Sequence, residues 1–311
     1  MIMNKEEFYN HLSNLCVFTP RFWENEVKTA NYIKKVLEWY WLKYYTQKYN
    51  VSYPKWENYW LFVDWEMLEV LPCWFKSGEF KNNFKIIDSS NLELSSEKSI
   101  ISYNSKCDFV STPVIYENTA LAVKKQDIEK IKTAENIYGF LEVSKYDFIW
   151  ENIFLGNIQD PKKIIFCHYD SFWWGALDNW TWTSLLLLLS KKLDLSNYLI
   201  VFAGSEEISL ENTDEYWCYG YRKFEEKYLS LMEKTKEIII FDSFGYKENE
   251  IIADKNILKE AFLIKNKNLL DKVKMYASKF EYILENYHTP ADTPEKITNI
   301  DFEEILSIIN N

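Results

Sequence analysis

The part of the sequence that most constrains the fold begins at Lys163, where short apolar runs alternate with longer helical segments. Three runs rich in branched and aromatic side chains predict buried strands, at residues 164–167, 198–203 and 237–241. The segments that follow predict helices, at residues 181–191, 219–232, 268–280 and 302–309. Strands that alternate with helices indicate an α/β fold, with a mainly parallel sheet covered by helices on both faces. In such sheets, ligands bind beyond the carboxyl ends of the strands.

The N-terminal half of the chain is less regular. Residues 4–15 and 25–45 predict two helices, because apolar side chains recur there at helical spacing. From residue 51 to about residue 142 the pattern weakens into short β-like runs, at residues 60–63, 84–87, 100–103 and 114–116. We therefore interpret residues 1–311 as a single large domain, in which the region of about 51–142 forms outer strands and a small insertion.

Composition and charge exclude several classes of protein. The net charge of −11, without a basic stripe, argues against a nucleic-acid partner. The apolar runs are too short to span a bilayer, and the N-terminus lacks the basic and apolar regions of a signal peptide. The five cysteines are scattered and form no Cys-x-x-Cys pair, so the sequence predicts neither a disulfide framework nor a thiolate zinc site. A reducing cytoplasmic setting is the simplest interpretation.

Acidic residues and histidines follow each of the three predicted strands. His168 and Asp170 follow the first strand, Glu206 and Glu207 the second, and Asp242 the third. Imidazole nitrogen and carboxylate oxygen are ligands of zinc, and the surplus of carboxylates fits a site with two metal ions. Each residue alone has an ordinary explanation, such as a helix cap or a solvated surface. Three successive strands that all end in such residues are better explained by a dinuclear metal site.

Five motifs occur in order in the second half of the chain: His168-Tyr169-Asp170, Gly175-Ala176-Leu177-Asp178-Asn179, Glu206-Glu207, Asp242 and His288-Thr289-Pro290-Ala291-Asp292-Thr293. In composition and order these motifs resemble those of the M28 family of zinc aminopeptidases. The segment 19–45 also resembles the opening of that family, whereas the middle of the chain matches it poorly. The resemblance implies a three-layer zinc-peptidase fold, with a mostly parallel mixed sheet and helices on both faces.

The resemblance also implies a role for each motif residue. Its metal ligands would be Asp178, as a bridge between two zinc ions, His168 and Asp242 on one ion, and Glu207 and His288 on the other. Glu206 would be the general base, since a carboxylate that binds metal is not available to accept a proton. Asp170 would accept the far imidazole N–H of His168 and fix its tautomer. The family also implies a cis peptide bond after the bridging aspartate, between Asp178 and Asn179.

Three functions remain open at this point. The first is removal of N-terminal residues from peptides, whose partner is a peptide with a free N-terminus. The second is a glutaminyl cyclase, which resembles the same family but uses one zinc ion; the long segment between Glu207 and Tyr219 resembles that branch, whereas the HTPADT motif favours the peptidase. The third is an inactive binding or scaffold protein, which usually lacks ligands that this chain retains. Cobalt or manganese could occupy the same ligands as zinc.

Tryptophan stands where the M28 family has small residues. The chain has 13 tryptophans and only 7 glycines. Trp180 and Trp182 follow the bridging aspartate directly, and others fall at or beside further glycine positions of the family: Trp23, Trp41, Trp173, Trp174 and Trp217. We hypothesise that many of these residues are glycines in the source organism, encoded by UGA codons under an alternative genetic code. The competing interpretation is that they are true tryptophans, which line an aromatic substrate cleft.

Overall fold

A computed structural model describes residues 5–92, 98–171, 174–212 and 215–310 of the chain. The chain divides into two compact units. The first contains Met1–Asn50, Ile149–Ile283 and Asp292–Asn311, and the second contains Val51–Phe148 and Leu284–Ala291. Strands β1 (Tyr44–Val63) and β8 (Ile137–Gly156) are long enough to contribute residues to both units.

The first unit is built on a mixed sheet with the strand order β12-β13-β11-β9-β10-β8-β1. Its other strands are β9 (Lys163–His168), β10 (Tyr198–Ala203), β11 (Glu237–Phe241), β12 (Asn249–Ile252) and β13 (Val273–Ser278). The four central strands pair in parallel, whereas β12 and β8 pair antiparallel at the sides. The runs at 164–167 and 198–203 are buried throughout, as expected for strands that are covered on both faces.

Helices cover both faces of this sheet. They are α1 (Lys5–Cys16), α2 (Glu24–Trp39), α4 (Thr181–Leu189), α5 (Tyr219–Lys234), α6 (Lys255–Ala261), α7 (Phe280–Ile283) and α8 (Phe302–Asn310). Phe166 of β9 pairs with Ile240 of β11, so both side chains lie on the same face, and Phe241 lies on the opposite one. Helix α5 packs on Phe166, whereas α4 packs on Phe241 through Trp182.

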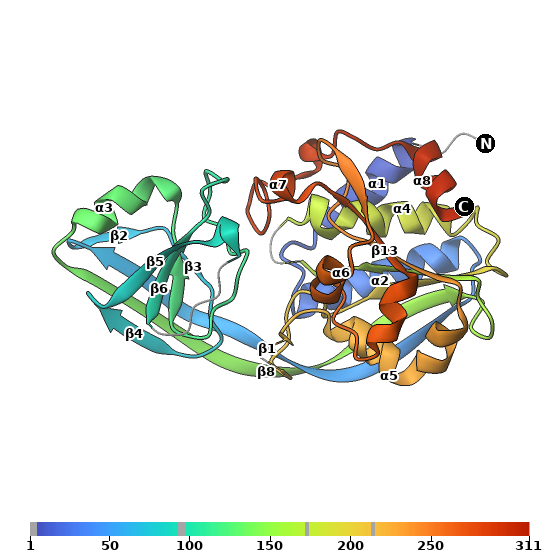
Figure 1. The fold of residues 1–311 in the computed structure, drawn as a ribbon, viewed down its shortest axis with the longest axis horizontal. Coiled ribbons are helices and arrows are strands. Elements are labelled where there is room, and N and C mark those ends of the chain that lie inside the picture. Colours follow the sequence, from blue (N-terminus) through green and yellow to red (C-terminus); the bar gives the residue numbers. More distant parts are fainter. Residues whose placement is uncertain (1–4, 93–97, 172–173, 213–214, 311) are drawn as a thin grey trace. The chain divides into compact units, whose positions relative to one another are not determined.

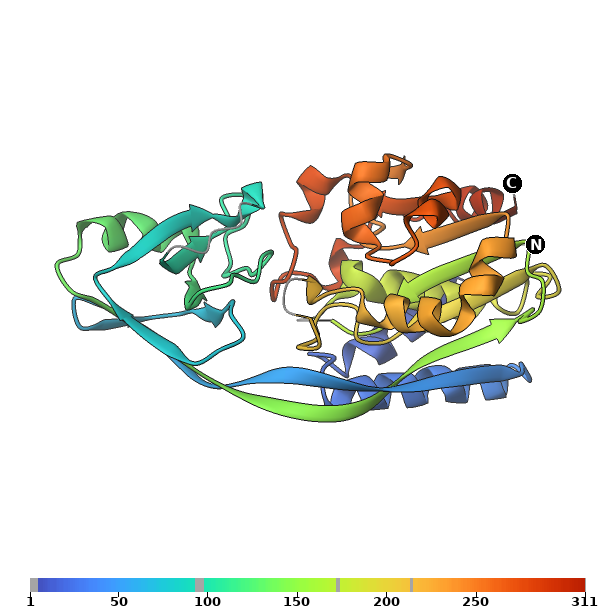
Figure 2. The same cartoon turned by 60° about the horizontal axis from the view of Figure 1, so that its bottom comes forward.

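The two ends of the chain meet in the first unit. Phe8 of α1 contacts Phe302 of α8, with 5.7 Å between the ring centroids, and the two helices are labelled near each other in Figure 1. Figure 2 shows the same elements from another side, with the N-terminal helices in blue and the C-terminal helices in red. The described residues also form short helical turns: η1 (Ser89–Asn91), η2 (Lys125–Asp127), η3 (Ala176–Trp180), η5 (Lys267–Lys272) and η6 (Pro294–Lys296). Among the described residues, we find no helix with the length and apolar character needed to cross a membrane.

The second unit contains a small sheet of its own. Its strand order is β3-β7-β6-β5, made of β3 (Leu71–Pro72), β5 (Phe84–Asp88), β6 (Ser99–Tyr103) and β7 (Ala120–Ala122). Strand β2 (Glu66–Leu68) pairs with the end of β1, and β4 (Gly78–Lys81) pairs with β8. Helix α3 (Ile128–Thr133) packs Ile128 and Ile131 into a core that also contains Leu61, Val63 and Ile101.

Three sequence predictions of secondary structure are wrong. The helix predicted for residues 25–45 ends at Trp39, because the backbone turns left-handed at Trp41 and β1 begins at Tyr44. The helix predicted for residues 268–280 is replaced by η5 and by β13, because residues 273–278 pair in parallel with β11 in the sheet interior. Residues 114–116 form no strand. The remaining strands and helices of the C-terminal half occur where the sequence predicts them, within about two residues.

Candidate metal centre

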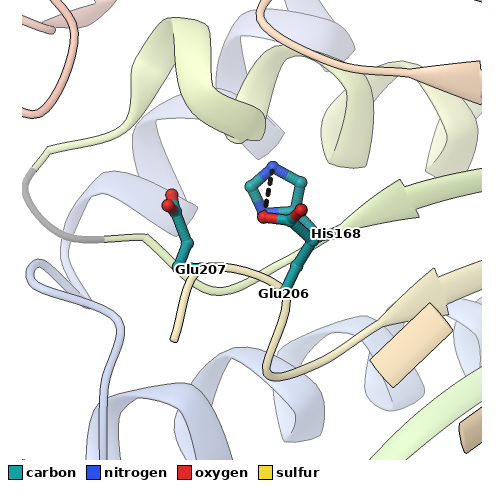
Figure 3. A group of neighbouring side chains, drawn as sticks. All are labelled: His168, Glu206 and Glu207. Carbon is teal, nitrogen blue, oxygen red and sulfur yellow. Dashed lines mark ion pairs between the residues drawn. The ribbon is translucent and has the colours of Figure 1, made fainter. Parts of the chain in front are cut away.

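The centre forms where three adjacent parallel strands end. Strand β9 lies between β11 and β10 in the sheet, so their carboxyl ends meet at one edge. His168 is the last residue of β9, Asp242 follows β11, and Glu206 and Glu207 follow β10 after two small residues. Figure 3 shows His168 with Glu206 and Glu207, which reach this edge from two different strands. The order of the strands therefore brings together residues that are far apart in the sequence.

His168 lies at the middle of a group of carboxylates. Its Nε2 atom is 3.0 Å from Asp178 Oδ1, 3.5 Å from Asp242 Oδ1 and 3.9 Å from Glu206 Oε2. The ligand atoms of His168, Asp178 and Asp242 lie within 4.8 Å of one another, and so do those of His168, Glu206 and Glu207. All of these side chains are buried except that of Asp242, which is partly exposed. Each group offers the imidazole and carboxylate ligands that suit zinc.

The tautomer of His168 follows from its hydrogen bond. Its Nδ1 atom lies 3.2 Å from the main-chain carbonyl of Asp170 and 3.5 Å from Asp170 Oδ1. A carbonyl oxygen only accepts, so Nδ1 carries the hydrogen, and Nε2, which faces Asp178 and Asp242, is the nitrogen that could bind a metal ion. Nε2 is buried and has no hydrogen-bond partner among the described residues. A metal ion bonded to Nε2 would satisfy this atom, so the donor set fits zinc.

Asp170 connects two of the ligand-bearing segments. Its Oδ2 atom accepts a hydrogen bond of 2.9 Å from the main-chain N–H of Glu207. The sequence predicts that the Asp170 carboxylate accepts the far N–H of His168, but the nearest acceptor is the Asp170 carbonyl. The role of Asp170 in orienting His168 stays a prediction, and its carboxylate holds the loop after β10 through the N–H of Glu207.

Asp178 lies in the turn η3, and its position is set by Asp292. The Asp292 carboxylate accepts hydrogen bonds from the N–H groups of Leu177, at 2.7 Å, and Asp178, at 3.2 Å. The peptide bond between Asp178 and Asn179 is cis, as the resemblance implies. The Asn179 side chain donates a hydrogen bond of 2.8 Å to the carbonyl of Phe241, next to Asp242. Asp292 was not assigned a role from the sequence, although it stands in the HTPADT motif.

Arg21 is a second residue near the site that received no role from the sequence. Its side chain is fully buried, and Nη2 donates a hydrogen bond of 3.2 Å to the carbonyl of Asp170. Its main-chain N–H donates to the carbonyl of Ser171, so the segment before α2 is attached to the loop after β9. Burial lowers the pKa of Arg21 to about 9, although Asp170 and Asp178 counteract this effect. Arg21 is one of only two arginines in the chain, which is the signal that the sequence offered.

The electrostatics of the site favour a cation. Burial raises the pKa of Glu206 well above its ordinary value; His168 lowers it, and Glu207 and Asp242 raise it further. Burial lowers the pKa of His168, but the carboxylates, Glu206 foremost, outweigh burial and raise it well above its ordinary value. Both shifts arise because several negative charges are confined in a space with little water. A divalent cation at this position would relieve their mutual repulsion.

His288 lies in the second unit, in the segment Leu284–Ala291. Its ring is buried, and Nδ1 is 3.0 Å from the carbonyl of Thr112, so this nitrogen carries the hydrogen. The ring stacks on Tyr287, with 3.8 Å between the centroids. The role of His288 as a metal ligand stays a prediction.

The tryptophans beside the site are part of the protein interior. Trp180 and Trp182 are fully buried, and their Nε1 atoms have no hydrogen-bond partner in the described part of the chain. The Arg21 guanidinium lies 4.4 Å from the centre of the Trp180 ring. Trp182 stacks face to face on Phe241, at 3.6 Å between centroids, which is closer than the usual 4.5–7 Å. These two indoles therefore do not line an open substrate cleft. Trp173 lies outside the described residues.

Comparison with known proteins relates the fold to zinc peptidases. No family model matches the sequence, and no curated protein sequence matches it either. The structure is similar to a zinc aminopeptidase from Bacillus subtilis, with 16% identity, 96% of this chain and 91% of that chain covered, and a TM-score of 0.67. It is also similar to a peptidase M28 precursor from Shewanella amazonensis, with 13% identity, coverage of 94% and 88%, and a TM-score of 0.65.

A third similar structure is a glutaminyl cyclase from Bacteroides thetaiotaomicron, with 13% identity, 96% of this chain and 92% of that chain covered, and a TM-score of 0.50. At these identities the comparisons show the fold alone. The chain has the M28-type zinc-aminopeptidase fold, with glutaminyl cyclases as more distant structural relatives, and the fold class predicted from the sequence is confirmed.

Proposed function

We propose that the protein is a zinc-dependent aminopeptidase that hydrolyses the N-terminal residue from peptides. One observation carries this proposal: His168, Asp178 and Asp242 converge at the strand ends, with the Glu206 carboxylate beside them. This arrangement occurs in a fold that the chain shares with zinc aminopeptidases. By TM-score, the zinc aminopeptidase and the peptidase M28 precursor are also more similar to this chain than the glutaminyl cyclase is.

The proposed centre holds two zinc ions. The residues that would hold them are His168, Asp178, Glu207, Asp242 and His288, as the resemblance to the M28 family implies. The support is the orphaned Nε2 atom of His168 and the surplus of buried carboxylates around it. When bound, zinc lowers the pKa of water and polarises the carbonyl of the scissile peptide.

Glu206 is the general base in this proposal. Its carboxylate lies beside the ligands, with Oε2 3.9 Å from His168 Nε2. A carboxylate that is not committed to a metal can accept a proton from the attacking water and pass it to the amine that leaves. The bond from carbonyl carbon to water oxygen forms, the C–N bond breaks, and the proton ends on the amine.

The test combines zinc content with hydrolysis of leucyl-p-nitroanilide. We expect about two zinc ions per chain and hydrolysis in the wild type. Glu206→Gln is expected to lose about 10²–10⁴-fold in kcat while it retains its zinc. Glu250→Gln, which changes an exposed carboxylate on β12, is the matched control and is expected to keep full activity.

A peptide with N-terminal glutamine separates the two enzymatic functions. Release of ammonia and a cyclised product, with one zinc ion per chain, would identify a glutaminyl cyclase instead. Zinc binding without turnover of either substrate would identify a binding protein. Activity that survives Glu206→Gln would contradict the assignment of the base.

We also propose that several tryptophans are decoded as glycine in the source organism. Trp23, Trp41 and Trp65 have φ values of 53°, 59° and 72°, a region that side chains other than glycine rarely occupy. The close stack of Trp182 on Phe241 is a further indication of a small residue. For the setting of the protein, we propose a reducing cytoplasm, because the five cysteines are free and buried.

A further inference from the structure

Cys218 contacts the side chain that we assign as the general base. The residue precedes α5 and is fully buried, and its Sγ atom lies 3.1 Å from Glu206 Oε1. The main-chain N–H of Cys218 donates a second hydrogen bond, of 2.5 Å, to the carbonyl of Glu206. Both the side chain and the main chain of Glu206 are therefore held by one cysteine, although 12 positions separate the two residues.

The thiol is the donor in this pair. Burial raises the pKa of Cys218 well above its ordinary value, and the Glu206 carboxylate raises it further, so the sulfur keeps its hydrogen. The S–H group is therefore the donor to the Glu206 side chain. The single S–H hydrogen has two acceptors in reach, Glu206 Oε1 at 3.1 Å and the carbonyl of Ala261 at 3.4 Å. The carboxylate oxygen of Glu206 is the nearer of the two acceptors.

The loop that carries Cys218 is fixed from both sides. Arg222 donates hydrogen bonds of 2.7 Å to the carbonyls of Trp217 and Glu215, immediately before the cysteine. Gly220, after it, donates a bond of 3.2 Å to the carbonyl of Ser205, two residues after the end of β10. The position of the sulfur relative to Glu206 is thus determined by the backbone.

We propose that Cys218 is a positioning residue, whose S–H group holds Oε1 of Glu206 and thereby directs Oε2 toward the metal ligands. The orientation is visible in Figure 3, where the Glu206 carboxylate turns toward His168, and Oε2 is the oxygen 3.9 Å from His168 Nε2. Without the thiol, Oε1 would have no hydrogen-bond donor in the described part of the chain to select this rotamer. This inference rests on the proposed function, in which Glu206 exchanges the proton.

The first test compares two substitutions at this position. Cys218→Ala removes the donor and is expected to lower kcat by about tenfold to a hundredfold, since hydrogen bonds to charged groups have effects of that size. KM is expected to change less than about twofold, and zinc content to stay the same. Cys218→Ser keeps a donor and is expected to recover most of kcat. Cys73→Ala removes a buried thiol from the second unit and serves as the matched control, with unchanged kinetics.

The second test measures the strength of the hydrogen bond from Cys218 to Glu206 directly, and it does not require enzymatic turnover. The S–H stretching band of Cys218, identified by its loss in Cys218→Ser, is recorded by infrared spectroscopy in wild type and in Glu206→Gln. A carboxylate accepts more strongly than an amide, so the band is expected at higher frequency in Glu206→Gln. An unshifted band, or full kcat in Cys218→Ala, would overturn the inference. A shifted band in an enzyme that hydrolyses no peptide would instead refute the proposed function.

Discussion

Replacing Trp41 with glycine is expected to stabilise the protein, whereas the same replacement at Trp39 is expected to destabilise it. Helix α2 ends at Trp39, and Trp41 follows with φ at 59°. The N–H of Trp41 donates to the carbonyl of Glu38, and the N–H of Leu42 donates to the carbonyl of Leu37. These two bonds define a Schellman motif, in which the left-handed position is most often glycine. The helix thus ends on a residue type that is strained there.

The magnitude follows from the backbone and from exposure. A left-handed conformation costs a residue other than glycine roughly 1–2 kcal/mol, and the added freedom of glycine in the unfolded chain offsets part of this gain. The Trp41 side chain is 94% exposed, so its loss removes little packing. We expect Trp41→Gly to raise the free energy of unfolding by about 1 kcal/mol. Trp39 is helical and stacks on Tyr40, so Trp39→Gly is expected to lower it by about 0.5–1 kcal/mol.

Trp65 also has a left-handed backbone, in the turn between β1 and β2. Val63 of β1 pairs with Glu66 of β2, which leaves Asp64 and Trp65 as a two-residue loop. Their φ values of 45° and 72° fit a type I′ turn, whose preferred sequences include Asp-Gly. The Trp65 side chain is 86% exposed, so Trp65→Gly is expected to stabilise the protein by a similar amount.

The assay is urea unfolding followed by far-ultraviolet circular dichroism, which does not depend on tryptophan emission. The comparison between Trp39→Gly and Trp41→Gly is the decisive one, because the two residues are exposed neighbours that differ in backbone conformation. Equal destabilisation by both changes would refute the argument from the left-handed backbone. The codons give an independent test: UGG at positions 41, 65, 180 and 182 would refute the proposed decoding as glycine.

Three further predictions concern the site and the surrounding core. Asp292→Asn places an amide group against the N–H donors of Leu177 and Asp178, and we expect zinc affinity to fall about 10–100-fold in a chelator competition. Dialysis against a chelator is expected to abolish peptide hydrolysis, and added zinc to restore it; activity without metal would contradict the proposed centre. Burial lowers the pKa of His11, so folding favours the neutral form of its side chain. The resulting stability is fully present above the pKa that His11 has in the unfolded chain, and it is lost as the pH falls through the pKa in the folded protein. Urea titrations at neutral and acidic pH are expected to show a smaller loss in His11→Gln than in wild type, and equal losses would count against this explanation.

The central strands could be predicted from the sequence because burial on both faces gives an unbroken apolar run. Residues 198–203 are an example, since the run and the strand coincide. The end of α2 was missed because Trp41 occupies a position where glycine would have signalled the stop. Strand β13 was missed because Lys274 and Met275 suit a helix as well, and only the pairing with β11 selects the strand. The local sequence pattern therefore does not predict the secondary structure where pairing with a distant strand determines it.

The same reasoning explains why the ligand motifs were recognisable while the residues that hold them were not. A metal ligand can be recognised from its residue type and from its position at the end of a predicted strand, as for His168 and Asp242. Asp292, Arg21 and Cys218 form hydrogen bonds to segments 12 to 149 positions away. The residue type alone does not indicate the hydrogen-bond partner, even for Arg21, which the scarcity of arginine singles out. The geometry of the candidate centre is thus set by residues whose contribution depends on the fold, and substitutions at these positions test the fold and the chemistry separately.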